Sequence, residues 1–138
     1  MSRIIETTET TAPLPNRVES QTSPQGDDLS EAVARSATFL AEDLGSKYIV
    51  VYTESGYTAR LVSKYRPKCS VLGLSRHEAV CRRMKLLWGV RAKQLGQVKD
   101  LDALVAKTLT ILLSAGCVKK GDLISVVAGT PFRVAGKT

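Results

Sequence analysis

Cysteine, histidine and aromatic residues are scarce in this chain of 138 residues. It contains three cysteines, one histidine and one tryptophan, and aromatic residues make up 5% of the sequence. Cys69, Cys81 and Cys117 lie 12 and 36 positions apart, which matches neither a disulfide framework nor the short paired spacing of a zinc site. His77 has neither the carboxylate–serine company of a catalytic triad nor a set of metal ligands near it in the sequence. We therefore expect reduced thiols, no metal site, and a surface or helix-capping role for His77 without catalysis.

Long hydrophobic runs are also lacking. The hydrophobic share of 43% is ordinary for a globular protein, and no run approaches the roughly 18 consecutive apolar residues that a membrane span needs. Residues 1–6 lack the apolar stretch of a signal peptide. We therefore expect no membrane association and a cytoplasmic location.

Acidic residues become rare in the second half of the chain. Residues 1–56 hold four basic and nine acidic residues, whereas residues 57–138 hold sixteen and four, so the second half should attract anions. Nucleic acid is one such anion. However, the four aromatic residues of this half do not form a base-stacking pattern. Small phosphorylated ligands are the preferred interpretation, and a basic nucleic-acid binder is the weaker alternative.

The chain divides into a short start, a linker and one domain. Residues 8–27 are rich in Thr, Ser and Pro without an apolar period, which is typical of a linker. Residues 1–7 are compatible with a helix, but a helix this short is not stable alone. We expect them to be the end of a helix from another domain, and residues 28–138 to form an α/β domain.

Strand and helix patterns alternate along residues 28–138. Apolar residues at helical spacing predict helices over residues 29–44, 57–65, 76–87 and 100–115, with Gly45 ending the first and Asp100 capping the last. Short runs rich in β-branched residues predict strands over residues 48–52, 70–74, 90–95 and 123–128, the last of them buried. Strands separated by helices imply βαβ crossovers. The prediction is a three-layer α/β/α domain with a mainly parallel sheet.

The turn after the first predicted strand is suited to bind a phosphate group. It contains Thr53, Ser55, Gly56, Tyr57 and Thr58, just before a helix whose N-terminus supplies free N–H groups and a positive dipole end. Open α/β sheets bind ligands at the carboxyl ends of their strands, where this turn lies. The alternative is that these residues only shape the turn and cap the helix. The residue pattern alone leaves both interpretations open.

A longer stretch around this turn carries a family resemblance. The sequence VVYTESGYTARLVSKYRP at residues 50–67 resembles pyruvate kinases almost position by position. The similarity continues in SEAV at residues 30–33, LGLSR at 72–76, KKGD at 119–122, GTP at 129–131 and GKT at 136–138. The chain thus resembles the C-terminal, effector-binding domain of pyruvate kinase. This resemblance implies a mainly parallel sheet of five strands.

The resemblance also implies roles for particular residues. In that family, the turn holds a phosphate group of an allosteric sugar phosphate, which here implicates Thr53, Ser55, Gly56, Tyr57 and Thr58. A later loop closes over the effector. In this sequence the loop corresponds to Gly129, Thr130, Pro131, Gly136, Lys137 and Thr138.

Catalysis in that family takes place in other domains. A (β/α)₈ barrel and a lid domain bind phosphoenolpyruvate, ADP, magnesium and potassium, and the enzyme is a glycolytic homotetramer. The resemblance therefore implies no catalytic residue, metal or cofactor in this chain, which we expect to be inactive alone. Residues 1–7 resemble the end of the last barrel helix, as in a fragment of the full enzyme.

Three departures from the family pattern bear on the effector. Glu54 replaces a Lys of the forms that respond to fructose 1,6-bisphosphate, and a carboxylate should repel phosphate by on the order of 1 kcal/mol. The segment before residue 100 lacks the Trp and Arg that bind a second phosphate in those forms. The sequence also stops at Thr138, before the family's final edge strand, so we expect a poorly closed effector loop.

These departures favour a monophosphate over a bisphosphate. Ribose 5-phosphate, glucose 6-phosphate and AMP are the expected effectors, and the absence of any effector is the alternative. The remaining alternative is a free-standing phosphate-binding α/β module or small enzyme, for which Glu54 is the local acid–base candidate.

Overall fold

A four-stranded parallel sheet forms the centre of the domain. The computed structural model describes residues 29–128. The strands are β1 (Tyr48–Tyr52), β2 (Ser70–Ser75), β3 (Val90–Gln94) and β4 (Ile124–Ala128), in the spatial order β3-β2-β1-β4. All three pairings are parallel. The parallel α/β architecture is therefore confirmed, whereas the prediction of five strands is wrong for the described residues.

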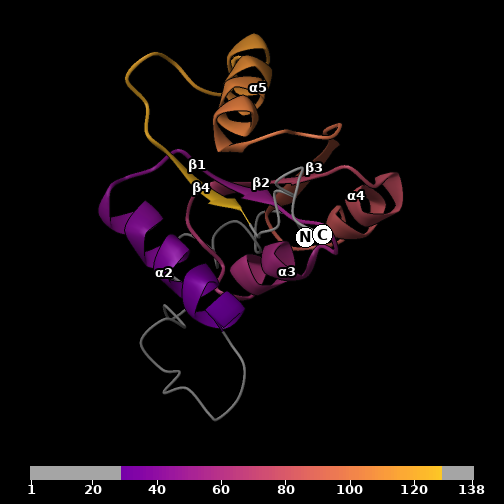
Figure 1. Ribbon diagram of the computed structural model, residues 1–138. Coiled ribbons are helices and arrows are strands. Elements are labelled where there is room, and N and C mark those ends of the chain that lie inside the picture. Colours follow the sequence, from indigo (N-terminus) through magenta and orange to yellow (C-terminus); the bar gives the residue numbers. More distant parts are fainter. Residues whose placement is uncertain (1–28, 129–138) are drawn as a thin grey trace, which may run out of the picture.

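Helices cover both faces of this sheet, as the alternating pattern predicted. Figure 1 shows α2 (Leu29–Asp43), α3 (Tyr57–Lys64) and α4 (Glu78–Met84) on one face, and α5 (Leu101–Ser114) on the other. Parallel strands need such crossover connections, and these place helices on the faces of the sheet. The expected three-layer arrangement is present.

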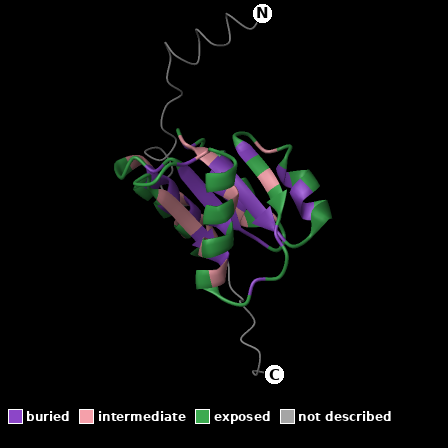
Figure 2. Ribbon diagram, turned by 90° about the horizontal axis from the view of Figure 1, so that it is seen from above, coloured by how far each residue is buried: buried purple, intermediate pink, exposed green. Residues whose placement is uncertain are grey.

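The core consists of two apolar clusters, one on each face of the sheet. Ile49 and Val51 point toward α2, α3 and α4, whereas Val50 belongs to the cluster beneath α5. All five residues of β1 are buried, and Figure 2 shows the buried strands between helices with exposed outer sides. A central strand covered on both faces must be apolar throughout. This requirement explains the uninterrupted run YIVVY.

The last strand is less buried than its sequence suggests. We expected a buried strand, but four of the five residues of β4 are of intermediate exposure and only Val127 is buried. In the described part of the chain, β4 pairs with β1 on one side and is an edge of the sheet. An apolar run fits a partly covered edge as well as a central strand, so composition alone did not distinguish them.

Helix ends agree with the predicted signals in most places. Asp100 caps α5 by accepting a hydrogen bond from Ala103 N at 2.8 Å. Gly45 adopts a φ of 63° just beyond α2. The helix expected over residues 76–87 is shorter in the structure, where α4 begins at Glu78 and ends at Met84.

Two predicted regions lie outside the described residues. They are residues 1–28, which include the predicted helix remnant and linker, and residues 129–138, which include every residue of the predicted effector loop. Their assignments remain predictions.

Candidate functional site

The carboxyl end of β1 continues into a tight turn that leads directly into α3. This turn, residues 53–58, is called the β1–α3 turn below. Its path begins at the sheet, where Thr53 N donates to Leu74 O of β2 at 2.9 Å. Gly56 then adopts a left-handed conformation with a φ of 85° and precedes the first residue of α3. Glycine suits this position because a Cβ atom is strained at such a φ.

Hydroxyl groups of the turn partly satisfy its own backbone. The buried Thr53 accepts a hydrogen bond at Oγ1 from Gly56 N at 3.0 Å. Ser55 Oγ accepts from Tyr57 N at 3.3 Å. These two bonds are what the structural interpretation of the turn predicted. Thr53 therefore shapes the turn from the inside.

Two backbone donors that follow in α3 have no partner in the described part of the chain. The N–H groups of Thr58 and Ala59 have no hydrogen-bond partner among residues 29–128, and the first intrahelical bond beyond them runs from Arg60 N to Gly56 O at 3.0 Å. Unpaired N–H groups in the first turn of a helix, at the positive end of its dipole, favour an anion. The structure thus joins free backbone donors with the hydroxyls of Ser55 and Thr58.

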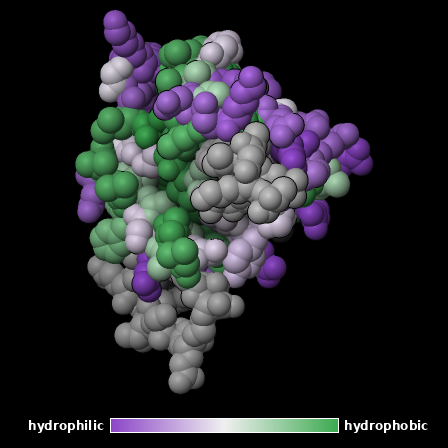
Figure 3. Space-filling view, viewed as in Figure 1, coloured by the Kyte–Doolittle hydropathy of each residue, from purple (hydrophilic) through white to green (hydrophobic). Residues whose placement is uncertain are grey.

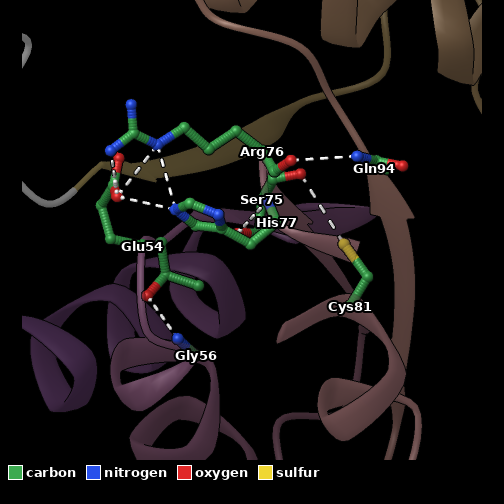
Figure 4. Close-up of polar contacts among 8 residues, drawn as sticks. Glu54, Gly56, Ser75, Arg76, His77, Cys81 and Gln94 are labelled. Atoms are coloured by element: carbon green, nitrogen blue, oxygen red, sulfur yellow. Dashed lines mark hydrogen bonds and ion pairs between the residues drawn. The ribbon is translucent and has the colours of Figure 1, made fainter. Parts of the chain in front are cut away.

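The Glu54 side chain contacts the two residues that follow β2. Figure 4 shows its carboxylate directed at Arg76 and His77, which follow β2. Arg76 Nη2 and Nε lie 2.9 and 3.1 Å from Glu54 Oε2, and His77 Nε2 lies 3.3 Å from the same oxygen. An adjacent cation offsets the repulsion that a lone carboxylate would exert on a phosphate. The expected penalty from Glu54 is therefore smaller than its sequence position suggested.

His77 lies on the surface at the start of α4. It is the N-cap residue of this helix, although its side chain makes no capping bond. Its carboxylate contact could not be seen in the local sequence, because Glu54 lies 23 positions away. Its contacts are with Glu54 and Arg76 on the surface, and they do not form a catalytic triad.

Residues at the ends of β2 and β3 extend the polar edge beyond the turn. Ser75 is fully buried, and its Oγ accepts from His77 N at 3.3 Å. Gln94 Nε2 donates to Arg76 O at 3.0 Å. Sequence analysis missed Arg76 and Gln94 as site residues. The available signal was their place at the ends of parallel strands, which share one edge of a sheet.

Two further features of the described residues bear on other functions. No group of three or more His, Cys, Asp and Glu side chains among residues 29–128 is arranged to hold a metal ion. Over the same residues, every helix is too short or too polar to cross a membrane.

Comparisons with known proteins agree with the fold and with the family resemblance of the sequence. The family model "Pyruvate kinase, alpha/beta domain" matches residues 31–138. The chain is 35% identical over 114 residues to a pyruvate kinase of Lactobacillus delbrueckii subsp. bulgaricus, covering 83% of this chain and 19% of that protein. It is 38% identical over 109 residues to a pyruvate kinase of Clostridium acetobutylicum, covering 79% of this chain and 23% of that protein.

A solved structure gives the same result in three dimensions. A crystal structure of pyruvate kinase from Cryptosporidium parvum superposes with a TM-score of 0.81 at 29% sequence identity. The match covers 93% of this chain and 26% of that chain. The chain therefore spans less than a quarter of the length of the two curated relatives, at 19% and 23%.

Proposed function

The chain belongs to the pyruvate kinase alpha/beta domain family, and from this we propose that it is the effector-binding and subunit-contact domain of a pyruvate kinase. Such an enzyme transfers the phosphoryl group of phosphoenolpyruvate to ADP, giving pyruvate and ATP, as a cytoplasmic step of glycolysis. In this proposal the chemistry, with its magnesium and potassium ions, belongs to the barrel and lid domains. The role of this domain is regulatory.

The unpaired donors of the β1–α3 turn are the observation that carries the effector role. The N–H groups of the partly exposed Thr58 and the fully buried Ala59 have no partner among residues 29–128, and Ser55 is exposed. Thr58 and Ser55 are thus the accessible donors. A phosphate oxygen accepts hydrogen bonds from such groups without displacing any bond of the helix. A bound phosphate thus adds interactions at these groups and breaks no backbone hydrogen bond of α3.

A monophosphate fits the surroundings better than a bisphosphate. The segment between β3 and α5 contains buried Leu95 and Val98, and Lys99 is its one basic side chain. No Arg or Trp is present there to hold a second phosphate group. Ribose 5-phosphate, glucose 6-phosphate and AMP are therefore the proposed effectors. Ligand binding would shift an equilibrium between two states of the enzyme through different contacts in each.

Isothermal titration calorimetry of the chain with these three compounds and with fructose 1,6-bisphosphate tests the effector role. Ser55→Asp places a carboxylate in front of the free donors, so binding should weaken at least about tenfold. Thr110→Asp is the control, because it adds the same charge at an exposed site on α5. Failure of every compound to bind below millimolar concentration, with no effect of Ser55→Asp, would refute the effector role.

Exposed apolar side chains on α2 and directly after it support a subunit contact. Phe39, Leu40 and Leu44 are 47%, 53% and 55% exposed, and Figure 3 shows hydrophobic surface on the side where α2 lies and hydrophilic surface on the side of α4. A hollow between α2 and the edge strand β4 is lined by Val33, Leu40 and other small or apolar residues. Contiguous apolar surface of this kind favours association. We assign it to a second copy of the chain.

Sedimentation velocity over a range of protein concentrations tests this contact. Leu40→Glu should shift the chain toward monomer, because it places a charge within the apolar surface. Leu113→Glu is the matched control, since Leu113 is 52% exposed but lies on α5, across the sheet. An equal effect of both changes would argue against α2 as the contact.

A further inference from the structure

We propose that Arg76 is a ligand-binding residue of the β1–α3 turn, and that Glu54 occupies its guanidinium until a phosphate monoester competes for it. This inference rests on the proposed function, because it assumes that the turn binds phosphate. The inference adds to the site Arg76, which follows β2. It also adds a competitor, Glu54, that sets the affinity of the site for phosphate. The ligand class is a phosphomonoester dianion with a single anionic group.

The contact between Glu54 and Arg76 is suited to exchange. Arg76 Nε and Arg76 Nη2 both donate to the single oxygen Oε2 of Glu54, and His77 Nε2 lies 3.3 Å from the same oxygen. The carboxylate thus does not form the fork with two parallel bonds that makes arginine pairs strong. Both side chains are also close to half exposed, at 44% and 43%, and solvent-exposed ion pairs add little to stability. A phosphate group can offer Arg76 two oxygens in place of one.

The backbone of Arg76 is held independently of Glu54. Its carbonyl accepts from Gln94 Nε2 at 3.0 Å, and the preceding Ser75 is fully buried at the end of β2. The following residue is fixed by the bond from His77 N to Ser75 Oγ. Arg76 can therefore release Glu54 without movement of the strand. Its side chain alone changes partner, and Figure 4 shows it reaching between the two turns.

The charge of the turn explains why Arg76 is needed. The turn itself contributes N–H and hydroxyl donors and the negative charge of Glu54, but no basic side chain. A phosphate dianion bound there would face an uncompensated carboxylate if Arg76 were absent. The guanidinium already lies within hydrogen-bonding distance of a turn residue. It is thus placed to supply the missing positive charge.

A double-mutant cycle tests the exchange. The full chain and its Glu54→Gln, Arg76→Gln and doubly substituted variants are titrated calorimetrically with ribose 5-phosphate and with inorganic phosphate. Glu54→Gln should tighten binding about threefold to tenfold, and Arg76→Gln should weaken it about tenfold. In the Arg76→Gln background, Glu54→Gln should change the dissociation constant less than about twofold. Arg76→Lys should restore part of the affinity, because lysine keeps the charge but loses the fork.

Each outcome of the cycle has a distinct meaning. If Glu54→Gln tightens binding equally with and without Arg76, then Glu54 acts only by repulsion and the exchange is refuted while the proposed effector site stands. If neither probe binds to any variant, the effector site itself is refuted, and the exchange with it. The matched control is the exposed pair Arg82 and Glu78, whose atoms lie 2.7 Å apart on α4. Glutamine at these two positions should leave binding unchanged.

Discussion

The β1–α3 turn and the connection from β2 to α4 (residues 76–77, the β2–α4 turn) each lead from a parallel strand into a helix. The first offers backbone N–H groups to a ligand, whereas the second offers charged side chains. In each, a hydroxyl at the strand end accepts from a backbone N–H of the turn, Thr53 from Gly56 and Ser75 from His77. The first turn then uses a left-handed glycine and leaves helix N–H groups free. The second has no glycine and carries Arg76 and His77, whose side chains reach the first.

This difference shows how one site arises from two similar motifs. Backbone donors are precise but carry only partial charge, whereas long side chains carry full charge but are less ordered. The β1–α3 turn supplies the first kind of group and the β2–α4 turn supplies the second. Parallel pairing of β1 with β2, in which Tyr52 lies opposite Leu74, brings the two kinds together.

Gly56→Ala should lower the stability of the domain most. It replaces the left-handed glycine that distinguishes the β1–α3 turn from the β2–α4 turn. A Cβ atom at a φ of 85° is strained, and it would also contact Met84 and Val80 at 3.4 Å. We expect the free energy of unfolding to fall by about 1–2 kcal/mol, measured by urea denaturation, and phosphate binding to weaken.

Gly45→Ala is the matched control for that change. Gly45 has a φ of 63°, but a Cβ atom added there would meet no heavy atom within 4 Å, so it reports the backbone cost alone. A loss of stability at Gly45 greater than that at Gly56 would contradict the importance assigned to the packing of the first turn.

Removal of the two strand-end hydroxyls should give a smaller and unequal effect. Thr53→Val leaves Gly56 N without its acceptor at 3.0 Å, whereas Ser75→Ala leaves His77 N without a longer bond of 3.3 Å. We expect losses of about 1 kcal/mol and about 0.5 kcal/mol respectively, again from urea denaturation. A larger loss for Thr53→Val than for Ser75→Ala would show that the β1–α3 turn depends more on its internal hydrogen bond. A larger loss for Ser75→Ala would contradict this.

The smallest change in stability should come from pH. It acts through the contact of Glu31 on α2 with Lys64 and Tyr65 at the end of α3. The Tyr65 hydroxyl and then the Lys64 ammonium lower the pKa of Glu31 below its ordinary value. Since the folded pKa is lower than the unfolded one, this contribution is present above the unfolded value near 4.5 and is lost as pH falls through the folded pKa. A denaturation series across this acid range should show the loss.

The same contact predicts an alkaline limit. Burial, and then the hydrogen bond to Glu31, raises the pKa of Tyr65 from 10.0 to about 12. This contribution is therefore complete below pH 10.0 and is lost as pH rises toward about 12. Tyr65→Phe should flatten both limbs of the stability profile. Glu78→Gln, on the exposed α4 pair, is the control and should flatten neither.

Much of the fold could be predicted because local patterns and global packing agree. The run YIVVY predicted β1 with the bounds that the structure shows, since a strand buried on both faces must be apolar throughout. The capping role of Asp100 was equally local. The number of strands and the exposure of β4 could not be obtained this way, because they depend on which strand lies at the edge.

The sequence by itself determined the turn, its donors and the family to which they point, because Thr53, Ser55, Gly56, Tyr57 and Thr58 are contiguous and their geometry is set by neighbours along the chain. Only the tertiary structure decided the surroundings of Glu54. Arg76 and His77 lie 22 and 23 positions from it, and no local pattern relates residues so far apart. They meet because two parallel strands end at the same edge of the sheet.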